Sequence, residues 1–282
     1  MTDAPRLPVP TWFVGCGNMG GAIVEGWRGA GYDLSSSVVI RPSGMPVEGV
    51  RTVSRIADAG APPRLVVLAF KPQKLDEIAP ELRKYLSAKT TVVSILAGVE
   101  AVSLRQRFPG VGAIVRAMPN LPVAIRRGVV ALYSEDADEA TRTELSQIFA
   151  PLGYAPWIPD EGKFAAVGSV AGAGPAYVAR FITALTKAGE TRGLSNELSS
   201  TIALETVLGT AWLAAAKTEG MDSIAKRVAS PNGTTEAGLK ILDHDNVLNE
   251  LLALTIDAAA RRGAELADEA KAPSLAETPR LS

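Results

Sequence analysis

The chain has 282 residues, which is enough for two domains of ordinary size. Hydrophobic residues make up 47% of it and aromatic residues only 5%, so aliphatic side chains must supply most of a large core. The 29 basic residues nearly balance the 30 acidic ones, and a net charge of -1 excludes the basic surface typical of binding to nucleic acid or an anionic membrane.

The single cysteine, Cys16, rules out an intrachain disulfide and fits a reducing compartment. Residues 1–10 contain no apolar run and no Arg/Ser-rich pattern, so no secretory or transit peptide is expected. The most apolar helical segment, residues 206–216, lies between Glu205 and Lys217 and is too short to cross a bilayer. We therefore expect a cytoplasmic protein with no membrane segment and no metal site.

The first predicted element is an apolar strand at residues 12–14 that runs directly into a GxGxxG motif and then a helical pattern. In that context Gly15 permits the turn, Gly17 lets the backbone approach a pyrophosphate, and Gly20 lets the helix pack closely. The helix N-terminus, with Asn18 and Met19, would face the anion. A tight turn without a ligand is the alternative. Cys16, inside this loop, fits a packing role better than a redox role.

The type of dinucleotide depends on the end of the second predicted strand, residues 38–40. A domain that prefers NAD carries an acid there for the ribose 2′-hydroxyl. Here the strand is followed by Arg41 and Ser43, with no acid. The missing acid favours NADPH, with NADH still possible. A solvated surface charge is the alternative interpretation of Arg41.

Three further aliphatic runs and two weaker segments complete the first half, with helical patterns such as residues 75–86 between them. Continuous apolar runs are typical of parallel strands covered on both faces. The pattern predicts a doubly wound, Rossmann-type α/β domain over residues 1–159. Its remaining strands are expected at residues 65–70, 91–96 and 112–117, with edge strands at 129–133 and 154–158.

Two of these strands end in candidate ligand residues. Ala69, Lys71 and Pro72 follow the third strand, and Ala97 and Gly98 follow the fourth. The carboxyl ends of parallel strands meet at the ligand crevice, so these residues are predicted to contact the cofactor. Lys71 could equally be an exposed loop cation.

Long Ala/Leu-rich segments replace strands after about residue 159, which predicts an all-helical domain over residues 160–270 and a disordered tail over 271–282. Because residues 198–216 are apolar almost all round, that helix must be buried on every side. A small bundle cannot do this alone, so we expect a homodimer or a larger homo-oligomer. The helices are predicted at residues 162–192, 196–219, 221–228, 234–243 and 246–270.

The segment from Ser230 to Thr235 combines a Pro-Asn-Gly turn with a helix start at Thr234. In one interpretation Ser230 or Thr234 caps the helix and Gly233 makes the turn. In the other, the N–H groups of the helix start bind a carboxylate and the hydroxyls face a polar substrate. Spacing alone does not separate the two.

The motifs together resemble those of the pyrroline-5-carboxylate reductase family, in order and spacing, from Phe13 to about Ala267. The similar segments are Phe13–Gly20, Ala69–Pro72, Arg116–Asn120, Gly172–Tyr177 and, most specific, Ser230–Thr235. The resemblance implies an NAD(P)H-dependent enzyme that reduces 1-pyrroline-5-carboxylate, a small imine, to L-proline in the last step of proline biosynthesis.

The resemblance also implies roles for individual residues. Ser230 and the N–H groups of Gly233 and Thr234 would hold the substrate carboxylate. The hydroxyl of Thr235, the implied catalytic residue, would hydrogen-bond the ring nitrogen. Glu161 matches a family acid near the substrate.

The chain departs from the family pattern in three places. Asn232 replaces the first glycine of the signature, but asparagine tolerates a positive φ. Ala171 and Ala173 stand where serines are common. A family asparagine that contacts the cofactor has no counterpart around Arg55.

Two other functions compete. A β-hydroxyacid dehydrogenase would carry a catalytic lysine on the first long helix of its second domain, and residues 172–186 contain none. A non-catalytic dinucleotide-binding regulator would not need the Ser230–Thr235 segment.

Overall fold

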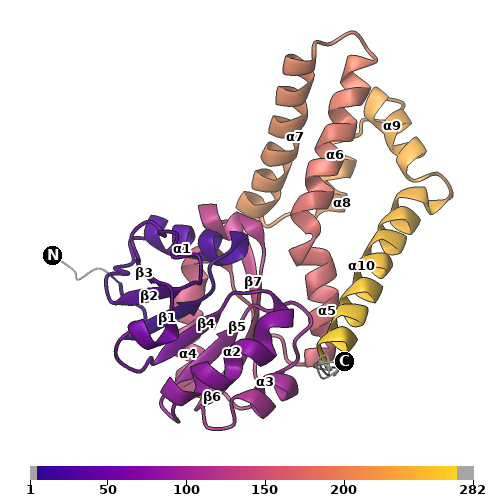
Figure 1. The fold of residues 1–282 in the computed structure, drawn as a ribbon. Helices are drawn as coiled ribbons and strands as arrows, with labels where there is room; N and C mark the ends of the chain where they lie inside the picture. Colours follow the sequence, from indigo (N-terminus) through magenta and orange to yellow (C-terminus); the bar gives the residue numbers. More distant parts are fainter. Residues whose placement is uncertain (1–4, 272–282) are drawn as a thin grey trace, which may run out of the picture. The chain divides into compact units, whose positions relative to one another are not determined.

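The computed structural model describes residues 5–271, whose first half forms one eight-stranded sheet in the order β3-β2-β1-β4-β5-β6-β7-β8 (Figure 1). Strands β1 to β6 pair in parallel, β7 is antiparallel to β6, and β8 is parallel to β7. The predicted doubly wound α/β class is confirmed. The strands are β1 (Thr11–Val14), β2 (Ser37–Ile40), β3 (Arg51–Val53), β4 (Leu65–Leu68), β5 (Thr91–Ser94), β6 (Ala113–Pro119), β7 (Gly128–Tyr133) and β8 (Gly153–Tyr154).

The strand order fixes where a ligand can bind. From β1 the chain first builds outward through β2 and β3, then returns to place β4 on the other side of β1. The reversal opens a crevice at the carboxyl ends of β1 and β4, which is the ligand site of this class of sheet. The GxGxxG loop follows β1 directly.

Some predicted strands differ in extent from those observed. β3 has no buried residue and was missed, because a three-residue edge strand leaves no apolar run. The runs at residues 65–70 and 91–96 stop being strands at Leu68 and Ser94, where the chain leaves the sheet. Beyond Tyr154, residue Trp157 makes only an isolated bridge to Leu132.

Helices cover both faces of the sheet, and the division can be followed from two consecutive residues of β1. Phe13 packs in one core cluster with side chains from α1 (Asn18–Gly29) and α4 (Glu139–Phe149). Trp12 packs in the opposite cluster with side chains from α2 (Leu75–Leu82) and α3 (Ala101–Arg107). Successive strand residues point to opposite faces, so one strand anchors both layers.

The helix predicted over residues 162–192 is interrupted. It consists of a 3-10 turn (Glu161–Lys163), α5 (Phe164–Val167), a π-helical stretch (Gly168–Gly172) and α6 (Gly174–Glu190). Gly168, Gly172 and Gly174 lower the local helix propensity, and Pro175 lacks the N–H that a continuous helix would use. The later helices lie close to their predicted positions: α7 (Asn196–Lys217), α8 (Met221–Val228), α9 (Thr234–Leu242) and α10 (Val247–Lys271).

The chain divides into two compact units. One, the sheet unit, contains the described residues up to Ala173 and those from Ala259 onward; the other, the helical unit, is Gly174–Ala258. The functional boundary expected at residues 159 and 160 stays a prediction. All of the predicted tail except Lys271 lies outside the described residues.

Within the helical unit, α6 and α7 pack closely. The Ser199 hydroxyl donates to the carbonyl oxygen of Thr186 at 2.6 Å. A Cβ on Gly189 would lie 2.1 Å from the Ser199 oxygen, so this contact requires glycine. Few other residues of the unit are buried. On α7, Ile202 and Leu208 are 47% and 46% exposed in a single chain. This agrees with the prediction that one chain alone cannot bury this helix.

α7 is longer than the apolar segment that the sequence analysis weighed for membrane crossing, residues 206–216. It begins at Asn196 and has 22 residues, with a mean hydropathy of 1.3 over its most apolar window, of which 11% is buried. By length and composition it could cross a membrane, and it is the one helix in the described part of the chain that meets this test. The sequence-based estimate considered residues 206–216 alone and therefore missed the contribution of the preceding turns.

Candidate functional site

A cleft of about 770 Å³ lies at the carboxyl ends of β1, β2, β4 and β5. It gathers all the predicted cofactor residues except Gly98, which does not line it. Four residues that we did not assign also line it: Cys16, Pro42, Phe70 and Ile95. The predicted residues in the lining are Gly15, Gly17, Asn18, Met19, Gly20, Arg41, Ser43, Ala69, Lys71, Pro72 and Ala97.

The glycine loop has the geometry that its sequence predicts. Gly15 has a φ of 77°, and a Cβ there would lie 2.5 Å from the carbonyl oxygen of Ala69, so no other residue fits. Its N–H donates to the carbonyl oxygen of Ile40 at 2.8 Å, which ties the loop to β2. α1 begins after Gly17, with no acidic residue in its first turn. Its N-terminus therefore presents uncompensated N–H groups to the cleft.

Cys16 lies within this loop, and its side chain is buried. Burial raises the pKa of the thiol, and the positive charge of Arg41 offsets part of that rise in pKa. The thiol is thus neutral at ordinary pH, which fits the predicted packing role and not a redox role. Arg41 therefore lies near enough to the glycine loop for its positive charge to interact with Cys16.

The charges around the cleft are all of one sign. Among the described residues that line it, Arg41 and Lys71 are cations and none is a carboxylate. The N–H of Arg41 donates to the carbonyl oxygen of Val53 at 2.9 Å, which fixes the turn after β2 to the end of β3. A cleft with this charge favours a phosphorylated ligand.

Arg55, near the position where the family asparagine has no counterpart, does not line the cleft. Its guanidinium is held by the carboxylate of Asp58 through two hydrogen bonds of 2.9 Å each. Arg55 therefore does not take the place of the missing cofactor contact.

The Ser230–Thr235 turn belongs to the helical unit. Asn232 has a φ of 57°, so the predicted tolerance of asparagine for this conformation is confirmed. The N–H of Gly233 donates to the carbonyl oxygen of Ser230 at 2.9 Å, and a Cβ on Gly233 would lie 2.4 Å from the Ser230 hydroxyl. The N–H of Asn232 donates to a carboxylate oxygen of Glu236 at 2.6 Å. These bonds define the turn without using the threonine side chains.

The start of α9 separates the two interpretations of this segment. Its N-cap residue is Gly233, and no side chain caps the helix. The interpretation in which Ser230 or Thr234 is the cap is therefore wrong. Within the described residues, the N–H groups of Thr234 and Thr235 and the hydroxyl of Thr235 make no hydrogen bond. These groups are available to a ligand.

Glu161, by contrast, is already engaged in the sheet unit. Its Oε1 accepts from Nη1 of Arg116 at 2.7 Å and from the N–H of Ala101 at 2.8 Å, and its side chain is 21% exposed. A substrate contact for Glu161 stays a prediction. No group of three or more His, Cys, Asp and Glu residues that could hold a metal is found in the part of the chain that the structure describes.

Comparison with known proteins identifies the family. Residues 161–266 match the model described as pyrroline-5-carboxylate reductase dimerisation, and residues 12–98 match one described as NADP oxidoreductase coenzyme F420-dependent. The chain is 35% identical to the pyrroline-5-carboxylate reductase of Pseudomonas aeruginosa, over 95% of this chain and 98% of that protein. The chain belongs to the pyrroline-5-carboxylate reductase family.

Solved structures of this family agree in fold. The reductase of Coxiella burnetii has a TM-score of 0.83 and 31% identity, covering 92% of this chain and 98% of its own. The Plasmodium falciparum reductase, solved with NADP bound, has a TM-score of 0.82 and 24% identity, covering 92% and 98%, and shows the shared fold. The family predicted from the motifs is confirmed, and residues 161–266 form its dimerisation region.

Proposed function

We propose that this chain reduces 1-pyrroline-5-carboxylate to L-proline with NADPH, the last step of proline biosynthesis. The observation that carries the proposal is the 35% identity to the Pseudomonas reductase over 95% of the chain. The glycine-loop cleft supports it independently, since its size, charge and free helix N-terminus fit a dinucleotide. When bound, NADPH supplies the hydride that the imine carbon receives.

The cofactor would lie along the carboxyl edge of the sheet. We assign the pyrophosphate to the glycine loop and the start of α1, and the adenosine 2′-phosphate to Arg41 and Ser43. The absence of a carboxylate from the lining supports NADPH over NADH, because an acid there would repel that phosphate. The remaining contacts would come from the loops after β4 and β5: Ala69, Lys71, Pro72, Ala97 and Gly98.

The substrate would be held by the turn before α9. Its carboxylate would accept hydrogen bonds from Ser230 and from the N–H groups of Gly233 and Thr234, and its ring nitrogen would bond the Thr235 hydroxyl. For Gly233 this means sharing an N–H that now bonds Ser230, whereas the N–H of Thr234 is free. A helix N-terminus stabilises the negative charge of a bound carboxylate.

The chemical demand on the protein is small. If the imine enters protonated, its carbon accepts hydride without a strong general acid, and the chain's work is to orient the imine and bind its carboxylate. His244, the only histidine, has a side chain that is 71% exposed beside Asp245, which does not suit a proton donor in a closed site.

The exposed apolar surface of the helical unit supports assembly through this unit. We propose that α7 is covered by a second copy of the chain in an intertwined homodimer, within a larger ring or alone, and that the protein acts in the cytoplasm. The dimerisation match spans α7, which favours a protein partner over a lipid one for this apolar helix.

The test is an assay of NADPH oxidation by the purified chain, with and without the imine, followed by identification of the product. We expect imine-dependent loss of NADPH absorbance and stoichiometric L-proline. NADPH binding with no turnover of the imine would favour a regulatory protein and reject the proposed reaction. A parallel series with NADH measures the cofactor preference.

A further inference from the structure

One face of β6 carries an unusual set of side chains. Arg116 and Met118 lie in the strand and Asn120 is the extended residue directly after it; the three follow at intervals of two and therefore point to the same side. Arg116 is 7% exposed and is the one charged residue that is buried in the part of the chain that the structure describes. Asn120 is also 7% exposed. Buried polar groups of this kind need hydrogen-bond partners, and the side chains of Arg116 and Asn120 both have them within the fold.

These side chains hold the segment Glu161–Gly172. Arg116 donates to Glu161 at 2.7 Å, and its guanidinium lies over the Phe164 ring, 4.5 Å from the centroid. A Cβ on Gly168 would lie 3.2 Å from the Met118 methyl, which shows how closely the π-helical stretch packs. The Asn120 amide donates to the carbonyl oxygen of Ala171 at 3.0 Å. The segment is thus fixed to β6 along its whole length.

Glu161 extends this arrangement to the cofactor cleft. The same carboxylate oxygen that accepts from Arg116 also accepts from the N–H of Ala101, the first residue of α3. Ala101 ends the loop of residues 95–100 that follows β5. Ile95 and Ala97 of this loop line the cleft. Only six residues separate β5 from α3, so the position of Ala101 restricts the conformation of the whole loop.

We propose that Arg116 and Glu161 are positioning residues that hold the 95–100 loop in the shape required to bind the dinucleotide, and that Glu161 does not itself contact the substrate. The inference rests on the proposed function for the identity of the ligand. The N-cap residue of α3 provides no side-chain cap. Instead Glu161, 60 positions later in the chain, accepts the hydrogen bond from the first N–H of the helix. Removing either partner leaves the other charge poorly compensated in a largely buried site.

The experiment uses the full chain and three variants: Glu161→Ala, Arg116→Met and Glu161→Gln. Two quantities are measured without any imine present. The first is the Kd for NADPH, from nucleotide fluorescence. The second is the amide hydrogen exchange rate of Ala101 and the preceding loop in the absence of nucleotide. The KM for the imine at saturating NADPH is then measured for each variant.

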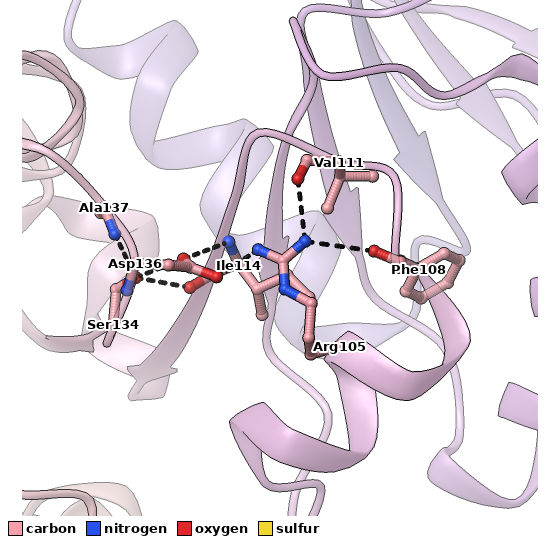
Figure 2. Close-up of polar contacts among 7 residues, drawn as sticks. All are labelled: Arg105, Phe108, Val111, Ile114, Ser134, Asp136 and Ala137. Atoms are coloured by element: carbon pink, nitrogen blue, oxygen red, sulfur yellow. Dashed lines mark hydrogen bonds and ion pairs between the residues drawn. The ribbon is translucent and has the colours of Figure 1, made fainter.

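A matched control is available at the other end of β6. Asp136 accepts from the N–H of Ile114 at 2.9 Å and forms an ion pair with Arg105, which also donates to the carbonyl oxygens of Phe108 and Val111 (Figure 2). Asp136 therefore holds a backbone N–H and an arginine, as Glu161 does. Unlike the 95–100 loop, however, the segments that Asp136 holds contribute no residue to the lining of the cleft. Asp136→Ala should lower the melting temperature and leave the Kd for NADPH unchanged.

We expect Glu161→Ala and Arg116→Met to raise the Kd for NADPH by about 2- to 30-fold, the range found for residues that couple to a site without touching the ligand. Amide exchange at Ala101 should accelerate in Glu161→Ala. The imine KM should stay within about twofold of the wild-type value. Glu161→Gln, whose carbonyl oxygen can still accept from both donors, should restore most of the affinity.

Several results would overturn the inference. One is unchanged exchange at Ala101 in Glu161→Ala; another is faster exchange with an unchanged Kd for NADPH. A rise in imine KM alone would instead indicate direct substrate contact by Glu161. If the wild-type chain binds no NADPH, the proposed function fails, and the exchange at Ala101 still decides whether Glu161 holds the loop. If Arg116→Met does not fold, the two Glu161 variants carry the test.

Discussion

The sheet unit and the helical unit use apolar side chains in opposite ways. In the sheet unit the large aromatic side chains Trp12, Phe13, Trp27 and Phe149 are completely enclosed. In the helical unit most large apolar side chains of α6, α7 and α10 are exposed in a single chain. The first unit is complete by itself, whereas the second presents a surface that must be covered. In a single chain the core of the sheet unit is therefore fully enclosed, whereas the core of the helical unit is only partly enclosed.

The largest effect is expected where this contrast is greatest. Leu208→Glu on α7 places a charge on a surface that we propose a second copy covers. An unpaired buried charge costs about 3–5 kcal/mol, which weakens the dimer by about 150-fold to 5,000-fold. Sedimentation should show monomers, and imine reduction should fall with dimer content.

The control for this prediction is Tyr154→Glu, which changes a side chain that is 71% exposed on the sheet unit. It should affect neither assembly nor activity. A Leu208→Glu protein that remains dimeric and active would show that this part of α7 is not covered by a second copy.

The second effect tests whether the helical unit contributes chemistry as well as contacts. A hydrogen bond to a charged group contributes about 1.5–3 kcal/mol, so Thr235→Ala should lower kcat/KM for the imine by about 10- to 150-fold. NADPH affinity should hardly change. Since no side chain caps α9, the melting temperature should also change little.

Thr191→Ala is the control for Thr235→Ala, because it removes an exposed threonine hydroxyl that bonds only the carbonyl oxygen of Ala188. Near-wild-type turnover in Thr235→Ala would reject the catalytic assignment.

The third effect tests the specificity of the sheet unit. Arg41→Asp replaces the cation beside the glycine loop by the acid that an NAD-preferring domain carries. The KM for NADPH should rise by about tenfold or more, and the KM for NADH should fall. Equal KM values for the two cofactors in the wild-type enzyme would contradict the assignment of Arg41 and Ser43.

The fourth effect concerns the stability of the enclosed core. Burial, with a hydrogen bond to Glu135 and the charge of that carboxylate, raises the pKa of Tyr133 to about 12. The unfolded chain would ionise this tyrosine near pH 10 and the folded chain near pH 12, so the neutral form stabilises the fold below pH 10. That contribution, about 3 kcal/mol for a difference of two pKa units, is lost as the pH rises from 10 to 12.

Tyr133→Phe should therefore flatten the decline in stability over this pH range, as measured by urea unfolding at several pH values. The same decline in the variant as in the wild type would show that other groups cause it.

The two units also differ in how well the sequence predicts them. The sheet unit follows from local patterns, because each aliphatic run is a strand and the glycine loop has a sequence-specific geometry. The edge strand β3 escaped because exposed residues leave no such pattern. In the helical unit the helix positions were predicted well, but the covering of α7 depends on atoms outside the chain.

The candidate site shows the same limit. The motif residues at the strand ends were predicted because topology alone brings them to one edge. The roles of Arg116 and Glu161 could not be predicted from spacing, since their partners are 45 and 60 positions away and meet only through the fold. The alternation of Arg116, Met118 and Asn120 was the available signal, because a polar face on an otherwise apolar strand requires a partner.

This alternation also determines how β6 can align with its neighbours. Ala113, Val115 and Ala117 lie in the core cluster that contains Phe13 and Trp27, whereas Arg116 and Asn120 face the opposite side. A slip of one residue against β5 would exchange the two faces. Arg116 would then enter an apolar cluster that contains no carboxylate to pair with it, and burying an unpaired charge would strongly destabilise the fold. A one-residue insertion or deletion within β6 would therefore be among the least tolerated changes in this chain.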